Sequence, residues 1–417
     1  MEYSTLRLVS RLDGKNMKIT VGIFVCSALL FCTNPLKNGN ESSQEVIKEV
    51  SEIHPGAYST LKLLDYLKDK SVAIVSNHTG MVGDSHLVDT LLSLGAKISV
   101  VFAPEHGFRG DRPDGEKVDD QIDGKTGIPI VSLYGKNKKP SREQMQEIEV
   151  VVFDIQDVGA RFYTYLSTLH YVMQSCTEAK IPLIVCDRPN PNIHYVDGPV
   201  LDSEFSSFVG LHPVPVVYGM TIGEYALMIN GERWHHQDSC SLSILPCENY
   251  DRSTRYNLPI KPSPNLPAME SIYLYPSLCF FEGTSVSIGR GTDFPFTVVG
   301  EPGNQSGDFS FIPEPKEGAS MYPKHQGKTC VGYDISDYIE DPSAMNSIDL
   351  TWLIRMFKES PNSDDFFNAN GYFDKLAGTD ELRLAILNGK NEEEIRSSWL
   401  EDIEQFETIR SKYLIYK

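Results

Sequence analysis

The sequence predicts an α/β fold in which helices cover both faces of a mainly parallel sheet, followed by a smaller C-terminal α/β domain. Six short runs are rich in β-branched residues and apolar on both faces, as strands inside such a sheet must be. They span residues 71–76, 97–103, 128–133, 149–155, 181–186 and 214–218. Helical patterns lie between them, and this alternation is typical of a doubly wound α/β domain.

Two of the intervening segments have the spacing of amphipathic helices. In residues 84–95 four aliphatic side chains fall on one helical face, and in residues 162–179 five apolar side chains do so. These are Leu87, Val88, Leu91 and Leu92 in the first segment, and Leu166, Leu169, Val172, Met173 and Cys176 in the second. Each helix therefore has one face to place against the sheet.

A proline-rich stretch, residues 257–267, interrupts the alternation with four prolines in eleven residues. We place the domain boundary there, so that the first domain spans residues 56–262 and the second spans 263–417. The second domain ends in a helical tail, in which Asn391 is expected to cap a helix together with Glu394. The buried face of this tail is predicted to comprise Trp399, Ile403, Phe406, Ile409 and Tyr413.

Residues 1–32 have the composition of an export signal. From Met17 the chain reads MKITVGIFVCSALLFCTN, a lysine followed by an apolar run too short to cross a membrane as a folded helix. We expect Met17 to be the true start and Cys32 to carry a lipid, as in bacterial lipoproteins; ordinary cleavage or an uncleaved anchor is the alternative. Residues 33–55 would then be a polar tether for a protein of the cell envelope, facing the periplasm or anchored in the outer membrane.

The net charge of the chain excludes some classes of partner. With 57 acidic and 38 basic residues the formal charge is −19, so most of the surface repels phosphate and a nucleic-acid partner is not expected. The glycine-rich NHTGMVG segment after the first predicted strand lacks both the G-x-G-x-x-G and the Walker spacing, which argues against a nucleotide cofactor. We therefore expect a small molecule, a glycan or another protein as the partner.

Six cysteines follow the export signal, and none belongs to a CxxC pair of the kind that binds zinc. Because export permits disulfides, the short spacing between Cys240 and Cys247 makes them candidate partners. The others are expected to be buried as small hydrophobic residues: Cys176, Cys186, Cys279 and Cys330.

Polar side chains gather directly after the predicted strands. Ligands of an open α/β sheet bind beyond the carboxyl ends of the strands, because the loops converge there and helix N-termini point at the crevice. The first strand is followed by Asn77 and His78, and the second by Glu105, His106 and Arg109. The fourth strand is followed by Asp154, Gln156, Asp157 and Arg161, and the fifth by Asp187, Arg188 and Asn190. One such loop often holds only helix caps, but several at one sheet edge indicate a binding site.

Glu105 has two interpretations. It follows an apolar strand and a proline, so burial should raise the pKa of its carboxyl group, as a general acid at neutral pH requires. Alternatively, it pairs with Arg109 four residues later, which would lower that pKa instead. His106 beside it is a candidate base or hydrogen-bond donor, although a single histidine at a strand end is more often structural.

Three further groups of residues are candidates for binding. Tyr163, in an aromatic cluster at the start of the predicted helix, can stack on a sugar. The segment FFEGTSVSIGRGTDFPF contributes Glu282, Arg290, Thr292 and Asp293, and the glycines flanking Arg290 suggest close approach to a ligand or, alternatively, a tight hairpin. His78, His106, Asp154, Asp157 and Asp187 contain metal-binding groups, but they come from four loops without a local signature, so we expect no metal and no cofactor.

Five segments of the chain resemble the exo-β-N-acetylmuramidase (NamZ) family. They are SNHTG, FAPEHGFRG, FDIQDVGARFYTYLSTL, DRPNP and EGTSVSIGRGTDFPF, in this order, and the resemblance runs from about Val72 to the C-terminus. It implies a Rossmann-like N-terminal domain, a smaller C-terminal domain and an active site in a cleft between them. It also implies the release of N-acetylmuramic acid from the non-reducing ends of peptidoglycan fragments, with Glu105 in the EHG motif as the general acid.

This chemistry needs a second group besides the acid. A nucleophile would lie about 5 Å from it and a water-activating base about 6.5 to 9.5 Å away. Candidates are Asp154, Asp157, Glu282 and Asp293, or the substrate's own acetamido group. A guanidinium group can bind a carboxylate through two hydrogen bonds. The candidates for binding the lactyl carboxylate of muramic acid are therefore Arg109, Arg161 and Arg290. Each of them could alternatively form a structural salt bridge. Two other functions stay open: a saccharide-binding lipoprotein without catalysis, and a metal-dependent hydrolase.

Overall fold

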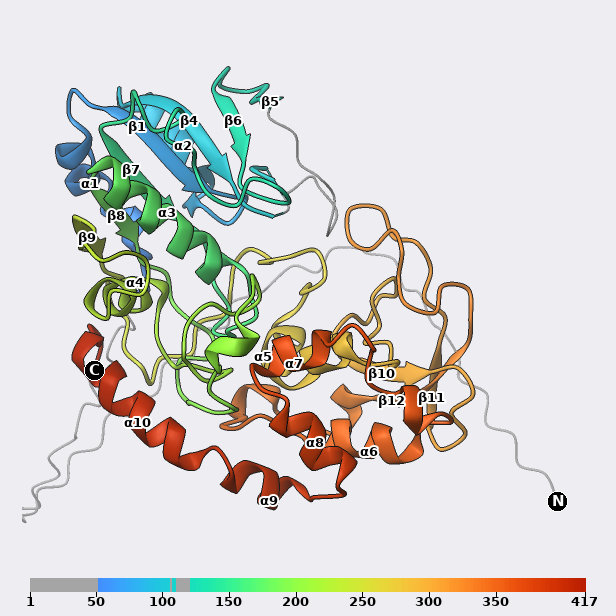
Figure 1. The fold of residues 1–417 in the computed structure, drawn as a ribbon. Helices are drawn as coiled ribbons and strands as arrows, with labels where there is room; N and C mark the ends of the chain where they lie inside the picture. The colour runs from blue at the N-terminus through green and yellow to red at the C-terminus, as the bar shows by residue number, and fades with distance from the viewer. Residues whose placement is uncertain (1–51, 106, 110–120) are drawn as a thin grey trace, which may run out of the picture. The chain divides into compact units, whose positions relative to one another are not determined.

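The computed structural model describes residues 52–105, 107–109 and 121–417, and the central element of this part is a seven-stranded sheet (Figure 1). Its strands follow the order β5 (Gln121–Ile122), β6 (Pro129–Ser132), β4 (Lys97–Ala103), β1 (Ser71–Ser76), β7 (Val150–Asp154), β8 (Leu183–Cys186) and β9 (Leu242–Leu245). Neighbouring strands are parallel except for β5, which runs antiparallel to β6. The prediction of a mainly parallel sheet is therefore confirmed.

Five of the six predicted strands are present with nearly the predicted bounds. The strand predicted at residues 214–218 is wrong: its side chains are buried, but the segment joins no strand, and Val217 makes only isolated bridges to Ala160 and Asp197. Pro213 and Pro215 lack the N–H groups that a central strand must donate to its neighbours. The prediction missed two strands of this sheet, β5 and β9, which form its two edges and whose residues are mostly not buried.

Helices cover both faces of the sheet, as the doubly wound fold requires (Figure 1). On β1, Val72 and Ile74 belong to a buried cluster with α1 (Thr60–Leu67) and α2 (Leu87–Ser93). The alternate residues Ala73 and Val75 belong to a second cluster with α3 (Tyr165–Ala179) and α4 (Ile222–Gly231). Because successive side chains of a strand point to opposite faces, each helix pair packs on its own side of the sheet.

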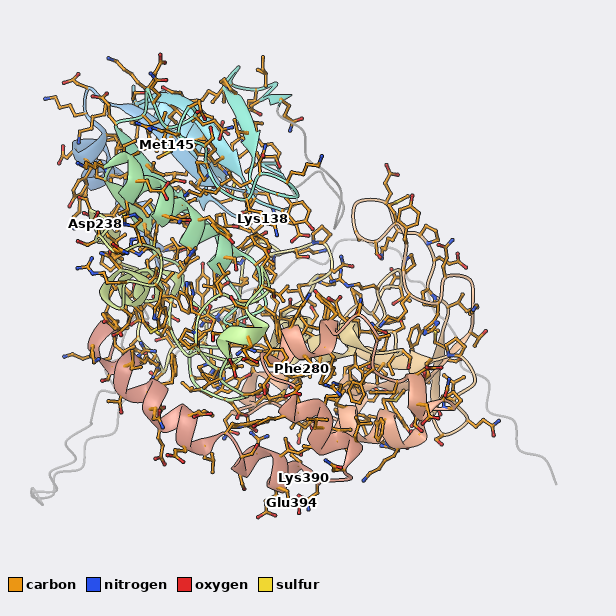
Figure 2. All side chains as sticks on the ribbon, in the orientation of Figure 1. Lys138, Met145, Asp238, Phe280, Lys390 and Glu394 are labelled. Carbon is orange, nitrogen blue, oxygen red and sulfur yellow. The ribbon has the colours of Figure 1, made fainter. Side chains whose placement is uncertain are left out.

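The C-terminal part adds a small antiparallel sheet and further helices. The sheet has the order β10 (Val298–Glu301), β12 (Cys330–Asp334) and β11 (Phe309–Phe311). A separate two-stranded sheet, which belongs to the first half of the chain near β1, consists of β2 (Met81–Val82) and β3 (Ser85–His86). The helices are α5 (Met269–Leu278), α6 (Thr351–Glu359), α7 (Tyr372–Ala377), α8 (Glu381–Leu387), α9 (Glu392–Ser397) and α10 (Leu400–Arg410). Phe280 is fully buried, whereas Lys390 and Glu394 lie at an exposed edge (Figure 2).

Short 3-10 helices connect many of these elements. They are η1 (Gly56–Tyr58), η2 (Ser203–Phe205), η3 (Cys279–Gly283), η4 (Ile335–Asp337), η5 (Pro342–Ala344), η6 (Ser363–Asp365) and η7 (Ser411–Tyr413). Among them η3 has a functional position, because it continues directly from α5 and carries Glu282.

The two halves of the described chain share one hydrophobic core. The buried cluster on the α3 face of the sheet continues without a break into C-terminal side chains such as Ile272, Phe280 and Trp399. The boundary predicted at residues 262 and 263 falls in the loop before α5, and it stays a prediction.

The predicted C-terminal tail consists of two helices. Asn391 caps α9, and its side chain and that of Glu394 accept each other's backbone N–H groups, as predicted. The chain then leaves the helix at Trp399 and begins α10. Trp399, Ile403 and Phe406 are buried as expected, whereas Ile409 and Tyr413 are partly buried.

The cysteines in the described part of the chain are free thiols, and all six are buried. The disulfide considered between Cys240 and Cys247 is therefore wrong. Cys240 belongs to the large core cluster on the α3 face, whereas Cys247 packs in a separate cluster with Tyr250 and Tyr416, so β9 separates the two thiols.

The last residues of the chain return to the first half of the fold. The Tyr416 hydroxyl donates to Asp187 Oδ2 at 2.6 Å and accepts from the backbone N–H of Cys247 at 2.8 Å. The backbone N–H of Tyr416 donates to Glu224, which also accepts two hydrogen bonds from Arg252 at 2.7 Å. This network joins the C-terminus to the β8 end and to α4.

The predicted export signal, residues 1–32, and the tether up to residue 51 lie outside the described residues. Among the helices that the structure describes, none has the length and apolar character needed to cross a membrane.

Candidate active site

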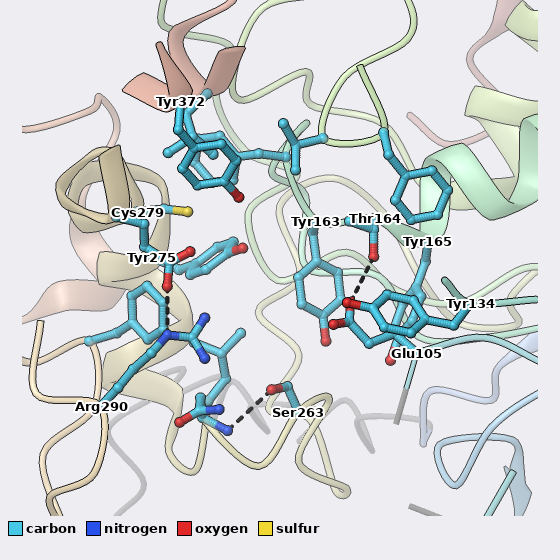
Figure 3. A pocket seen from close by; sticks show the side chains of 18 residues that line it. Glu105, Tyr134, Tyr163, Thr164, Tyr165, Ser263, Tyr275, Cys279, Arg290 and Tyr372 are labelled. Atoms are coloured by element: carbon cyan, nitrogen blue, oxygen red, sulfur yellow. Dashed lines mark hydrogen bonds and ion pairs between the residues drawn. The ribbon is translucent and has the colours of Figure 1, made fainter. Parts of the chain in front are cut away.

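A cavity of about 350 Å³ lies between the carboxyl ends of the sheet strands and the C-terminal part (Figure 3). From the first half of the chain come Glu105 after β4, Tyr134 after β6, residues 162–165 at the start of α3, and residues 208 and 209. Residues 263, 265 and 266 come from the loop before α5. The opposite wall consists of Tyr275, Cys279, Glu282, Arg290, Phe296, Tyr372 and Leu376.

Glu105 is half-buried and presents its carboxylate to the cavity. Strand β4 ends at Ala103, and Pro104 follows, so the chain turns at the sheet edge directly before the glutamate. The Thr164 hydroxyl at the N-terminus of α3 donates to Glu105 Oε2 at 3.3 Å. A carboxylate that is held by a neutral hydroxyl and faces a cavity can exchange a proton with a ligand.

Arg109 does not pair with Glu105, so that alternative is wrong. Its guanidinium binds Asp123, with Nη2 2.7 Å from Oδ2, and Asp89, with both Nη atoms 3.1 Å from carboxylate oxygens. It also lies 4.3 Å from the ring centroid of Phe108. Arg109 is therefore held by two carboxylates outside the cavity that Glu105 lines.

Glu282 and Arg290 form an ion pair on the opposite wall, with Arg290 Nε 2.5 Å from Glu282 Oε1. The guanidinium also lies 5.2 Å from the centroid of Phe296, which lines the cavity. Because the pair is only partly buried, it keeps both charges in contact with the cavity. One negative and one positive group therefore face the space opposite Glu105.

The glycines on either side of Arg290 serve the packing of the chain itself. Gly289 and Gly291 both have positive φ angles, of 77° and 80°. A Cβ atom on Gly289 would collide with the carbonyl oxygen of Phe294, and one on Gly291 with that of Glu314. The tight turn is thus the correct alternative, and its effect is to hold Arg290 in place.

Aromatic rings form much of the cavity surface. Tyr163 lines it, and its hydroxyl donates to the carbonyl of Pro262 at 2.8 Å. The Tyr163 ring meets Tyr165 and Tyr275 edge-on, with centroids 4.8 and 5.8 Å apart. Tyr275 in turn packs against Phe296 at 4.9 Å. Such apolar and amphipathic surfaces are typical of saccharide sites.

Sequence models of two domains from one family match almost all of this structure. The N-terminal domain of exo-β-N-acetylmuramidase NamZ matches residues 72–270, and the C-terminal domain of the same enzyme matches residues 273–416. This chain belongs to the NamZ family. The resemblance seen in the five sequence segments is therefore confirmed.

Individual proteins are similar over most of the chain. Peptidoglycan β-N-acetylmuramidase NamZ of Bacillus subtilis (strain 168) is 36% identical over 421 residues, which cover 96% of this chain and 100% of that protein. Crystal structures of two DUF1343 family proteins from Bacteroides fragilis NCTC 9343 have TM-scores of 0.81 and 0.75, at 44% and 27% identity. Each match covers 88% of this chain and 99% of the other.

The cavity contains four of the seventeen residues predicted for the site of this NamZ-family chain, namely Glu105, Tyr163, Glu282 and Arg290. His106 lies outside the described residues. Thr292 donates to the carbonyl of Gly289 at 2.6 Å, and the exposed Asp293 pairs with Lys316 at 2.7 Å, so both lie apart from the cavity. The other predicted residues contact protein groups around the sheet edge.

The two aspartates predicted after β7 are buried away from the cavity. Asp154 is fully buried and binds Arg188 through both oxygens, at 2.6 and 2.9 Å. Asp157 accepts a hydrogen bond from the Tyr218 hydroxyl and another from the backbone N–H of Gly159 at 2.7 Å. Burial raises the pKa of Asp157 to about 7. Neither carboxylate lies where it could contact a ligand in this cavity.

Arg161 is the most deeply buried of the predicted arginines. Its two terminal nitrogens donate to four backbone carbonyls, those of Pro199, Val214, Leu376 and Ala377, at 2.6 to 2.9 Å. Burial lowers its pKa to about 9, so it remains charged at neutral pH. Because these bonds occupy both nitrogens, Arg161 acts within the protein rather than on a substrate carboxylate.

Further polar residues at the strand ends hold the loops to one another. Asn77 donates to the hydroxyl of Tyr165 at 2.8 Å, and the His78 ring bonds to the carbonyl of Lys261 at 2.8 Å. Gln156 donates to the carbonyl of Pro189 at 2.6 Å. The Asn77 contact reaches the site indirectly, because Tyr165 lines the cavity.

Two more predicted residues lie around the end of β8. Asp187 binds Thr221, Gly223 and Tyr416, and burial raises its pKa to about 6. Asn190 donates to the carbonyl of Met220 at 2.8 Å. In the described part of the chain, no three histidine, cysteine, aspartate or glutamate side chains gather as a metal site would require.

Several cavity residues carry no signal in the sequence. Tyr134, Thr164, Tyr275, Cys279, Phe296 and Tyr372 line the cavity, but none was predicted as a site residue. Tyr372 in particular lies in YFDKLA, an ordinary helical segment 267 residues after Glu105 in the numbering. Only the fold brings it to the site.

The placement of Asp157 predicts that Asp157→Asn retains hydrolytic activity, because the side chain lies outside the cavity. The folded carboxyl has a pKa of about 7, above its ordinary value of 3.8. Between these two pH values the folded state therefore binds a proton that the unfolded state does not bind. As the pH falls from 8 to 5, the wild type should therefore gain about 2.5 kcal/mol of unfolding free energy relative to the variant.

Urea titrations of both proteins at the two pH values, with activity assays at neutral pH, measure these effects. A variant that folds but releases no product would restore Asp157 as a catalytic candidate.

Proposed function

We propose that this chain hydrolyses the β-glycosidic bond of a terminal N-acetylmuramic acid in peptidoglycan fragments. Its membership of the NamZ family and the named activity of the Bacillus subtilis relative support this class of reaction. The observation that carries the proposal is the position of Glu105, which faces a saccharide-sized cavity opposite Arg290 (Figure 3), the ion-pair partner of Glu282. Acidic groups on two facing walls suit glycoside cleavage.

Glu105 is the general acid in this proposal. It donates a proton to the glycosidic oxygen as the bond to the leaving sugar breaks. The half-buried carboxyl lies at the sheet edge next to Thr164, and Arg109, the nearest predicted cation in sequence, is engaged by Asp89 and Asp123. Glu105 therefore forms no direct ion pair with Arg109.

Glu282 is the second carboxylate in this proposal. Of the four carboxylates considered from the sequence, it alone lines the described cavity with Glu105. The contact with Arg290 Nε holds its orientation, so that Glu282 either attacks the anomeric carbon or activates the acceptor water. If the acetamido group of the substrate attacks instead, Glu282 supports that group.

Arg290 is the arginine best placed for the lactyl carboxylate. Arg109 is bound to two aspartates, and Arg161 is bound to four carbonyls, whereas Arg290 lines the cavity. A guanidinium pairs with a carboxylate through two parallel hydrogen bonds, which favours a sugar with an acidic substituent. The substrate anion and Glu282 then share one cation.

Glu105→Gln tests the acid. The amide keeps the shape of the side chain but cannot donate the proton, so kcat/KM for a natural disaccharide should fall at least about a thousandfold. A 4-nitrophenyl β-glycoside has a leaving group that needs little protonation, so the variant should lose much less activity on this substrate.

The matched control for this test is Glu147→Gln, a change at an exposed glutamate that should leave both rates unchanged. Equal losses on both substrates would argue against an acid, and full activity would exclude Glu105 altogether. Tight binding of the disaccharide without any turnover in the wild type would support the saccharide-binding alternative.

Glu282→Gln tests the second carboxylate. Glutamine can still accept the hydrogen bond from Arg290, so binding should change little while kcat falls at least about a hundredfold. Proton NMR of the first sugar released by the wild type identifies its anomeric form. Retention of the anomeric configuration by the wild type, together with loss of activity in Glu282→Gln, indicates that Glu282 is a nucleophile or supports one. An unchanged kcat would contradict a role for Glu282.

We also propose that the protein is exported and anchored through a lipid on Cys32, on the basis of the apolar run after Met17. Expression of the wild type and of Cys32→Ala, followed by fractionation, tests this. The wild type should remain with membranes and the variant should not, and equal distribution of the two would overturn lipidation.

A further inference from the structure

The hydroxyl of Tyr372 enters the cavity from the C-terminal part. Tyr372 is the first residue of α7, and Leu376, about one helical turn later, also lines the cavity. In Figure 3 the Tyr372 hydroxyl points inward, between the side that bears Arg290 and the side that bears Glu105. Its ring is half-buried, so the hydroxyl is presented from a packed surface.

The N-terminal end of α7 is held directly against η3. A Cβ atom on Gly283 would collide with the backbone of Phe373, so only glycine permits this approach. The backbone N–H of Asn368 also donates to the carbonyl of Gly283 at 2.9 Å. Tyr372 is therefore fixed beside Glu282, the residue that precedes Gly283.

The C-terminal end of α7 is held by the first half of the chain. Arg161 donates to the carbonyl of Leu376 at 2.9 Å and to that of Ala377 at 2.6 Å. Arg161 directly precedes residues 162–165, which line the facing side of the cavity. The guanidinium thus sets the distance between Tyr372 and that side, which makes Arg161 a positioning residue.

The Tyr372 hydroxyl is available as a hydrogen-bond donor. Across the described residues, no protein group forms a hydrogen bond with it. Burial raises the pKa of Tyr372, and the charge of Glu282 acts in the same direction, so the phenol stays protonated at neutral pH. A fixed donor that faces a cavity without a partner there leaves a hydrogen bond for a ligand to complete.

We propose that the Tyr372 hydroxyl donates a hydrogen bond to a neutral oxygen of the terminal sugar and so orients that sugar between Glu105 and Glu282. This inference rests on the proposed glycosidase function and adds a substrate-binding residue to it. The acceptor is a carbonyl or hydroxyl oxygen, because Glu282 on the same wall disfavours an anionic group beside Tyr372. The carboxylate of the sugar has its counter-charge at Arg290.

Tyr372→Phe tests the inference, because it removes only the hydroxyl and keeps the ring. We expect kcat/KM for the disaccharide to fall about tenfold, with the melting temperature unchanged. Binding is measured separately in the Glu105→Gln background, in which the disaccharide is not cleaved. There, addition of Tyr372→Phe should weaken calorimetric binding about tenfold.

Tyr195→Phe is the matched control, since the Tyr195 hydroxyl likewise forms no hydrogen bond within the described part of the chain but lies outside the cavity. It should change neither turnover nor binding. Tyr372→Phe with wild-type turnover and binding would overturn the inference, as would an activity loss explained by a lower melting temperature. Because the binding measurement needs no turnover, it separates failure of this inference from failure of the glycosidase function.

Discussion

The buried guanidinium of Arg161 is the interaction on which the cavity depends. It binds carbonyls from two loops of the first half, at Pro199 and Val214, and two from the end of α7. A buried cation is costly unless hydrogen bonds compensate it, and here four carbonyls satisfy both terminal nitrogens, although Nε has no partner within the described residues. A shift of α7 would break two of these bonds, so the arrangement tolerates little movement. The two sides of the cavity are therefore held at one separation.

Other buried charges join distant segments in a similar way. Asp154 and Arg188 link the ends of β7 and β8, and Arg252 binds Glu224, which accepts hydrogen bonds from the C-terminal residues. Asp197 binds Arg396 of α9 as well as the indole N–H of Trp399. Buried ion pairs add little net stability, but the loss of one partner leaves an uncompensated charge. We infer that these contacts chiefly specify how the C-terminal helices dock on the sheet.

These contacts explain which predictions from the sequence succeeded. The strands of the central sheet could be predicted because apolar character on both faces is a local property, and Glu105 could be placed because it follows one of them. The same rule also selected Asp154, Arg161 and Arg188, which bind protein groups instead. A polar strand end is equally suited to a ligand and to another loop, and the choice depends on partners far away in the sequence. For Arg161 those partners include α7, more than 200 residues later.

The failures have equally specific causes. Residues 214–218 have the apolar composition of a buried strand, but Pro215 within them and Pro213 just before them lack the N–H groups that a continuous ladder needs. Tyr372 could not be found from its neighbours, because its position depends on Gly283 and Arg161 rather than on a motif. The glycines around Arg290 indicate an unusual backbone in the sequence, but what requires them is the tight turn of the chain and not the approach of a ligand.

The division of the site between two segments has a chemical consequence. Glu105 comes from the sheet edge, whereas Glu282 and Arg290 come from the C-terminal part, so the two described carboxylates that line the cavity belong to different halves of the chain. Glycoside cleavage depends on the separation between such groups, because a nucleophile and a water-activating base need different distances. In this chain that separation follows from how the two halves dock, through the shared core and the Arg161 contacts. Under the proposed mechanism, the residues that hold the halves together therefore set the separation between the two catalytic carboxylates without touching the substrate.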